Sequence, residues 1–77
     1  MKDKELEAFV VAIERHFSAK RGQQHVLSPR DFALARGWHA AGVPLATVLA
    51  GVDRVLARER DVVSLRYCRR SIEALAS

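Results

Sequence analysis

Apolar residues recur three and four positions apart along most of the sequence, and this spacing restricts the possible folds more than any other feature. The stripe near the N-terminus runs from Leu6 to Phe17, and a second, cleaner stripe runs from Leu45 to Leu56. Residues with this spacing lie on one face of an α-helix, whereas a half-buried strand needs strict alternation. No segment alternates for long enough to predict a strand. The spacing therefore predicts an all-α fold.

Capping residues predict where four helices begin and end. Gly22 is placed to end the first helix, and Ser28 in front of a proline is a strong start signal for the second. Gly42 follows the second helix, Pro44 opens the third, and Ser64 caps the fourth. The predicted helices cover residues 3–20, 29–41, 44–60 and 64–76, with a tight connection over 61–63 and one domain over 1–77.

The apolar stripes of these helices are expected to meet in one core, giving a compact four-helix bundle. Trp38, the single tryptophan, is interpreted as a core anchor; the alternative is an exposed aromatic platform for a base or a partner. Cys68 is interpreted as a small buried side chain rather than a nucleophile. The predicted core residues are Phe9, Ile13, Phe17, Leu34, Trp38, Val48, Leu49, Val52, Leu56, Leu65, Cys68 and Ile72.

Length and composition describe one small domain. The 77 residues, 49% of them hydrophobic, allow one modest core, and a single cysteine cannot form an internal disulfide. No apolar run approaches the roughly 20 residues that span a bilayer, and the charged start is unlike a signal peptide. We therefore expect a cytoplasmic protein with no membrane partner.

The net charge of +4 is concentrated towards the C-terminus. Residues 54–77 contain six arginines and three acidic residues, whereas residues 1–53 are nearly balanced. Arginine presents a planar fork of donors that suits phosphate and carboxylate groups. This segment is therefore the candidate for binding an anionic partner.

The arginines of the last two predicted helices are expected to share one end of the bundle, because a short connection folds these helices side by side. An arginine surface with one aromatic residue is typical of nucleic-acid binding dominated by the phosphate backbone. The alternative is a solvated face that Glu59, Asp61 and Glu73 partly neutralise. The predicted nucleic-acid-binding residues are Arg54, Arg58, Arg66, Tyr67, Arg69 and Arg70.

Catalytic and metal-binding patterns are missing from the sequence. His16, His25 and His39 do not share the spacings that place ligands around zinc, either with one another or with Cys68. No Ser-His-Asp grouping or glycine-rich phosphate loop is visible. We therefore expect a protein that is not an enzyme and uses no metal or cofactor.

The stretch AAGVPLATVL resembles the turn of LacI-type repressor headpieces over about ten residues. Two features favour a simple bundle corner instead. Trp38 stands where such motifs usually have alanine, and its bulk would separate the helices. Of the residues that begin the next helix, only Thr47 is able to hydrogen-bond a base edge.

The order of helix signals also resembles the C-terminal domain of DnaD-like primosomal proteins. The likeness covers residues 17–75: a helix ending at Gly22, then LSPRD, a tryptophan helix closing on Gly42, and SLRYC at the start of the last helix. The stretch from Trp38 to Gly51 is also similar to an uncharacterised bacterial domain with the pattern W-x-x-x-G-[IV]-P-L-x-x-V-L-x-G, which implies no activity.

The DnaD-like resemblance implies a DNA-binding accessory role in replication initiation or helicase loading. Domains of that family bind DNA through the final helix and the tail after it, with a Tyr-x-x-x-Ile-x-x-x-Trp motif. Tyr67 matches the tyrosine, while Ser71 and Leu75 occupy the next two motif positions. The residues to which the resemblance transfers DNA binding are Tyr67, Arg66, Arg69 and Arg70.

A protein-interaction or assembly module without a nucleic-acid role is the alternative function. Small residues on the third predicted helix would let another helix approach closely, and a small domain gains core by forming a homodimer. The residues expected to form that contact, with a second copy or another protein, are Ala46, Ala50, Gly51 and Ala57.

Overall fold

The computed structural model describes residues 2–22, 26–59 and 64–77. Within these residues the chain forms four α-helices and one 3₁₀ turn, and it contains no strand. This confirms the predicted all-α bundle of four helices. The elements are α1 (Lys2–Arg21), α2 (Pro29–Ala40), α3 (Leu45–Leu56), the 3₁₀ turn η1 (Leu65–Cys68) and α4 (Arg69–Ala76).

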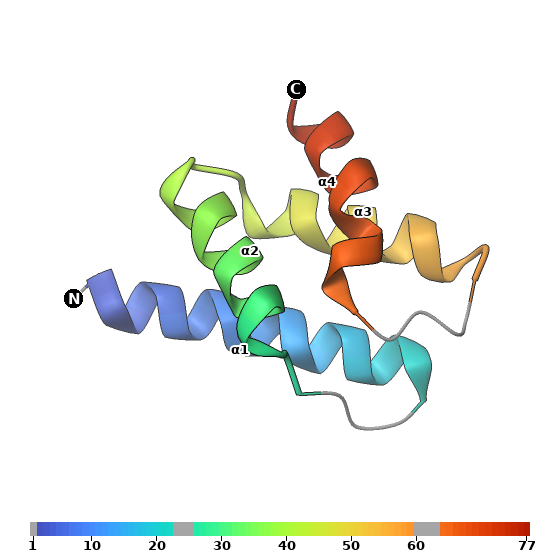
Figure 1. Cartoon of the computed structure of the whole chain (residues 1–77), viewed down its shortest axis with the longest axis horizontal. Coiled ribbons are helices and arrows are strands. Elements are labelled where there is room, and N and C mark those ends of the chain that lie inside the picture. The colour runs from blue at the N-terminus through green and yellow to red at the C-terminus, as the bar shows by residue number, and fades with distance from the viewer. Residues whose placement is uncertain (1, 23–25, 60–63) are drawn as a thin grey trace.

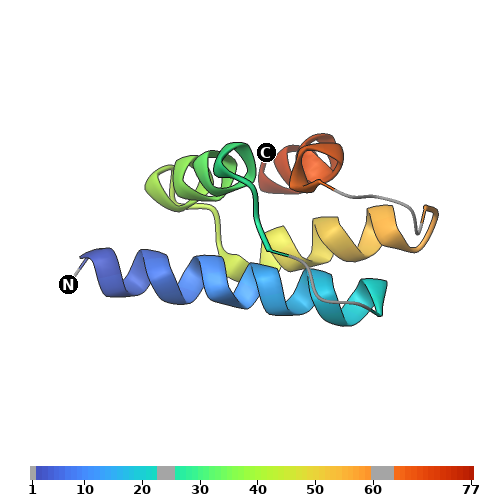
Figure 2. The ribbon, with the colours of Figure 1, turned by 60° about the horizontal axis from the view of Figure 1, so that its bottom comes forward.

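The helices form two layers. α1 and α3 run in the same direction in one layer, and α2 and α4 lie across them in the other (Figure 1, Figure 2). α1 packs against α2 and α3, α3 packs against α4, and η1 contacts both α2 and α3. These contacts close a ring of helices around one core.

Buried side chains from every helix form this core. Leu34 and Leu49, predicted as core residues, are only partly buried and pack against its edge. Each lies at the margin of its helix's apolar stripe, because successive residues turn by about 100° and the stripe is narrow. The other predicted core residues are buried, together with Val10, Ala35 and Val55.

α1 and α2 both begin and end within one residue of the predicted positions. Gly22 and Gly42 both have a positive φ, 75° and 81°, a conformation that glycine adopts without strain. The backbone N–H of Gly22 donates to the carbonyl of Ser18 at 3.0 Å. Ser28 caps α2, since its Oγ accepts the backbone N–H of Asp31 at 3.2 Å.

The third helix is shorter than predicted. It ends at Leu56 rather than near Arg60, because the backbone N–H groups of Arg58 and Glu59 both donate to the carbonyl of Val55, at 3.0 and 2.9 Å. Pro44 is its N-cap rather than its first helical residue. The predicted tight connection over 61–63 lies outside the described residues.

The fourth predicted helix begins as a 3₁₀ turn. Ser64 is the N-cap of η1, as predicted for the start of that helix, and its Oγ accepts the backbone N–H of Arg66 at 3.3 Å. Ser64 also donates through its Oγ to Oδ1 of Asp31 at 2.8 Å, although Asp31 is only 1% exposed. This buried contact joins the start of α2 to the start of η1.

Candidate nucleic-acid interface

The candidate interface begins where α3 and α4 touch. Gly51 is buried in α3, and a Cβ atom at this position would lie 2.9 Å from the Cα of Ile72 and 3.0 Å from its backbone nitrogen. Only glycine allows α4 to approach α3 this closely. Beside this crossing the two helices form an open groove.

The groove has arginines on both walls and a volume of about 630 Å³. Arg54 and Arg58 come from α3 and the residues just after it, one helical turn apart, while Arg70 comes from α4. Small side chains fill the surface between them. The lining residues are Arg54, Ala57, Arg58, Arg70, Ser71 and Ala74.

A second hollow of about 300 Å³ continues the groove. It shares Arg58, Arg70 and Ser71 with the groove and adds Val55, Glu59 and Tyr67.

Tyr67 presents a large aromatic surface at this hollow. The residue is 59% exposed, and its backbone N–H donates to the carbonyl of Ser64 at 3.2 Å. Arg66 lies beside it, with its Cζ 5.9 Å from the centre of the ring. Arg66 therefore belongs to the rim of the hollow, next to Tyr67.

Arg69 forms an ion pair with Glu73 and is not among the residues that line the groove. Its Nε donates to Oε2 of Glu73 at 3.0 Å, and the indole N–H of Trp38 donates to the same oxygen at 3.3 Å. The hydrogen bond from Trp38 and then that from Arg69 hold the pKa of Glu73 below its ordinary value. Arg69 therefore packs towards α2, apart from the groove residues with which it was grouped.

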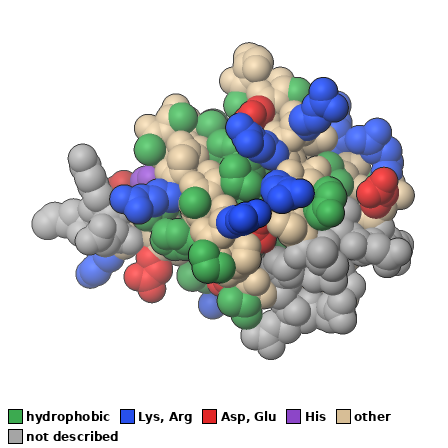
Figure 3. Space-filling view, in the orientation of Figure 1, with side chains coloured by type: hydrophobic (Ala, Val, Ile, Leu, Met, Phe, Trp, Pro, Cys, Tyr) green, Lys and Arg blue, Asp and Glu red, His purple; other side chains and the backbone are tan. Residues whose placement is uncertain are grey.

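The arginines of the groove and rim keep their charge available. Within the described residues, none of their guanidinium nitrogens lies within 4.0 Å of a carboxylate oxygen. Figure 3 shows Lys and Arg side chains gathered over α4 and the neighbouring part of α3. Several like charges around one concave surface produce a positive potential that attracts anions. The arginines of the groove and its rim are Arg54, Arg58, Arg66 and Arg70.

Three further residues that line the groove and the hollow were not predicted from the sequence as site residues: Ser71, Ala74 and Glu59. Ala74 lies four residues after Arg70 and three after Ser71, so the helical period places it near each of them. Glu59 was considered only as a neutralising charge, and its place in the second hollow depends on the turn after α3.

The AAGVPLATVL stretch connects α2 and α3, two helices that pack against α1 and η1 rather than against each other. The backbones of α2 and α3, both fully described, come close only at the turn itself, whereas each helix packs against α1 and η1. Trp38 is 5% exposed, which excludes its use as an aromatic platform. α3 therefore lacks the support from α2 that a recognition helix has.

Of the four small residues predicted to contact a second copy or another protein, one is buried inside the fold. Gly51 is buried against Ile72 of α4, so it cannot meet a second copy. Ala46, Ala50 and Ala57 remain exposed on α3 and its C-cap. The reason is helical geometry, since Gly51 lies on a different side of α3 from these three alanines.

An apolar hollow of about 310 Å³ lies between α1 and the start of α2. It is formed by α1 and by Phe32 at the start of α2, and Phe32 is 41% exposed. Its lining residues are Leu6, Glu7, Val10, Val11 and Phe32.

Metal-binding and membrane-spanning features are also missing where the structure can be described. In those parts of the chain, no group of three or more His, Cys, Asp or Glu side chains is arranged to hold a metal ion. His16 instead contacts Asp53, with 2.6 Å between Nε2 and Oδ1. His25 lies outside the described residues. No helix among those described is long and apolar enough to cross a membrane.

The fold and the groove thus define a small four-helix domain with an arginine-lined concave surface. A family model described as "Uncharacterised protein" matches residues 8–77, and the chain belongs to that family. The matched region includes every residue of the groove and its rim. Searches of curated proteins and of solved structures return no match.

Proposed function

We propose that this protein is a non-enzymatic accessory module that binds the phosphate backbone of DNA in the α3–α4 groove. The observation that carries the proposal is the placement of Arg54, Arg58 and Arg70 around one groove without an acidic partner among the described residues. Arginine forms two parallel hydrogen bonds to a phosphate group, and each phosphate contact releases condensed counterions.

The binding is expected to be largely independent of sequence. The groove offers guanidinium groups, one hydroxyl and alanine methyl groups, none of which is aimed along a protruding helix at base edges. Contacts of this kind position a strand without reading it. Specificity for particular sites would therefore have to come from elsewhere.

The cellular setting of the proposal comes from the resemblance to DnaD-like domains. That likeness supports a role in replication initiation or helicase loading, with Tyr67 and the arginines of η1 and α4 near the DNA. The cytoplasmic location that we propose comes from the composition of the sequence instead. Arg69 is excluded from the direct contacts we propose, because its guanidinium is already bound to Glu73.

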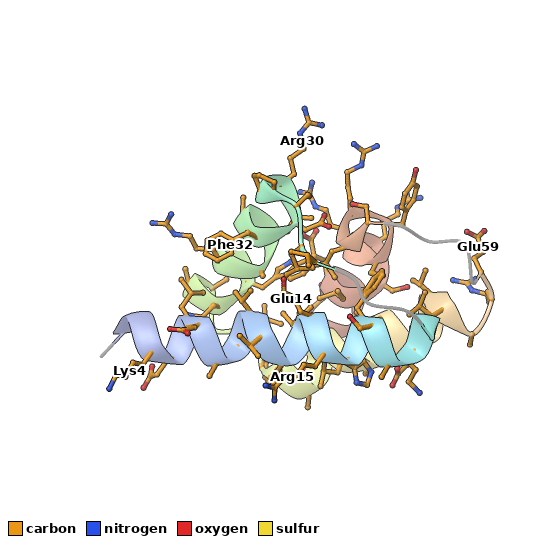
Figure 4. All side chains as sticks on the ribbon, turned by 90° about the horizontal axis from the view of Figure 1, so that it is seen from below. Lys4, Glu14, Arg15, Arg30, Phe32 and Glu59 are labelled. Atoms are coloured by element: carbon orange, nitrogen blue, oxygen red, sulfur yellow. The ribbon has the colours of Figure 1, made fainter. Side chains whose placement is uncertain are left out.

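The test compares two triple variants that remove the same charge. One is Arg54→Ala with Arg58→Ala and Arg70→Ala; the control is Lys4→Ala with Arg15→Ala and Arg36→Ala. Figure 4 shows Lys4 and Arg15 on α1, pointing away from α2 and α4. Binding of labelled DNA is measured by fluorescence anisotropy, and circular dichroism checks that both variants are folded.

The groove variant should lose on the order of tenfold in affinity for each lost phosphate contact at about 50 mM salt, while the control stays near the wild type. An equal loss in both variants would mean that only net charge attracts DNA. No loss in either would make the arginines a solvated face and would favour the protein-interaction alternative.

A further inference from the structure

We infer that the groove takes a single strand, with one base stacked on Tyr67. This inference rests on the proposed function and goes further by naming the form of the nucleic acid. It follows from the arginines that the groove shares with the second hollow and from the exposed ring of Tyr67 in that hollow.

The groove presents guanidinium groups from two sides to one ligand. Its walls are Arg54 and Arg58 on one side and Arg70 on the other, and the two helices meet at Gly51. Phosphates of one sugar–phosphate chain lying along this open groove therefore meet arginines of both helices.

The second hollow determines where the base of a bound nucleotide lies. Arg58 and Arg70 line both the groove and this hollow, and Tyr67 lines the hollow beside them. A phosphate held between the two arginines therefore has the tyrosine ring next to it. Val55 adds an apolar surface to the same hollow.

Tyr67 is suited to stacking because its ring is exposed and held in place. The 3₁₀ turn fixes its backbone through the carbonyl of Ser64, and Arg66 lies near its ring. In a duplex both faces of each base are covered by neighbouring bases, so only an unpaired base can use this ring. Base–aromatic stacking of this kind tolerates any base.

The experiment uses three probes with equal numbers of phosphates: a thymidine strand, the same strand without bases, and a blunt-ended duplex of two shorter strands. The whole chain is compared with Tyr67→Leu, which removes the aromatic face, and with Tyr67→Phe, which removes only the hydroxyl. Affinities are measured by fluorescence anisotropy at one low salt concentration.

The wild type should prefer the thymidine strand to the duplex. Tyr67→Leu should weaken binding of the thymidine strand on the order of tenfold, and leave the abasic strand and the duplex unchanged. Tyr67→Phe should bind all three probes as the wild type does. The abasic probe isolates stacking, because its phosphates are retained while its bases are absent.

Three results would overturn the inference. If the duplex binds as well as the thymidine strand and Tyr67→Leu changes neither, the groove holds the backbone but does not select single strands. If Tyr67→Phe loses as much as Tyr67→Leu, the hydroxyl rather than the ring contacts the strand. If the wild type binds none of the probes, the proposed function fails together with the inference.

Discussion

Asp31 and Ser64 show how single side chains set the orientation of the candidate interface. The Asp31 carboxyl group is buried and accepts a hydrogen bond from Ser64 Oγ at 2.8 Å, and Ser64 in turn caps η1. A buried hydrogen bond of this kind is costly to leave unmade, on the order of 1–3 kcal/mol for the group left without a partner. The contact therefore fixes the start of η1, which carries Arg66 and Tyr67, against α2.

The buried thiol of Cys68 makes the stability of the fold depend on pH above its ordinary pKa. Burial, and to a smaller extent the nearby charge of Asp31, raise the pKa of its thiol from the ordinary 9.0 to about 11. Below pH 9 the thiol is protonated in both the folded and the unfolded chain. Between about pH 9 and 11 only the unfolded chain ionises, so the free energy of unfolding should fall as the pH rises.

The measurement is urea unfolding of the wild type and of Cys68→Ala across this range. Other groups titrate in both proteins, so the difference between the two isolates Cys68. The stability advantage of the wild type should shrink from pH 9 to pH 11. Parallel curves would show that the thiol is not held in its neutral form.

The sequence alone predicted the two serine caps but not the buried contact between Asp31 and Ser64. Ser28 and Ser64 were identified as caps because their positions before helical stripes are local features of the sequence. The burial of Asp31 was not predicted, because its partner Ser64 is 33 residues away and only the folded chain brings the two together.

At the scale of elements, the crossing of α3 and α4 forms the groove, and Gly51 makes it possible. Gly51→Ala should destabilise the fold by about 1–3 kcal/mol, since the added methyl group meets the backbone of Ile72. This cost outweighs the roughly 1 kcal/mol by which alanine is the better helix former.

Gly37→Ala is the matched control for this prediction. Gly37 is an exposed glycine within α2, and a Cβ atom there meets nothing within 4 Å. Alanine should therefore stabilise the protein by up to roughly 1 kcal/mol at this position. Urea unfolding of both variants tests the pair, and equal stabilities would contradict the close packing at the crossing.

The end of a helix could be predicted where a residue at that position favours it. The ends of α1 and α2 were predicted well, because Gly22 and Gly42 adopt the left-handed conformation that ends a helix. The end of α3 was predicted too late, because no glycine or proline stands there and the helix ends in a turn in which two N–H groups share the Val55 carbonyl.

At the scale of the whole molecule, the groove depends on packing that the sequence indicated only partly. Arg54 and Arg58 are one turn apart, so their common side was predictable from the helical period. Their meeting with Arg70 requires the α3–α4 crossing. Arg69 was grouped with them, but its contact with Glu73 and the additional bond from Trp38 place it towards α2.

The groove arginines, and not Arg69, are the residues that we propose to contact phosphates. This assignment can be measured as the slope of log affinity against log salt concentration for the wild type, Arg70→Ala and Arg69→Ala. Arg70→Ala should make the slope shallower by about 0.7 on a single strand or 0.9 on a duplex, the value for one phosphate contact, while Arg69→Ala leaves it unchanged. Equal changes in both variants, or no change in either, would show that Arg70 and Arg69 do not differ in their contacts with phosphate.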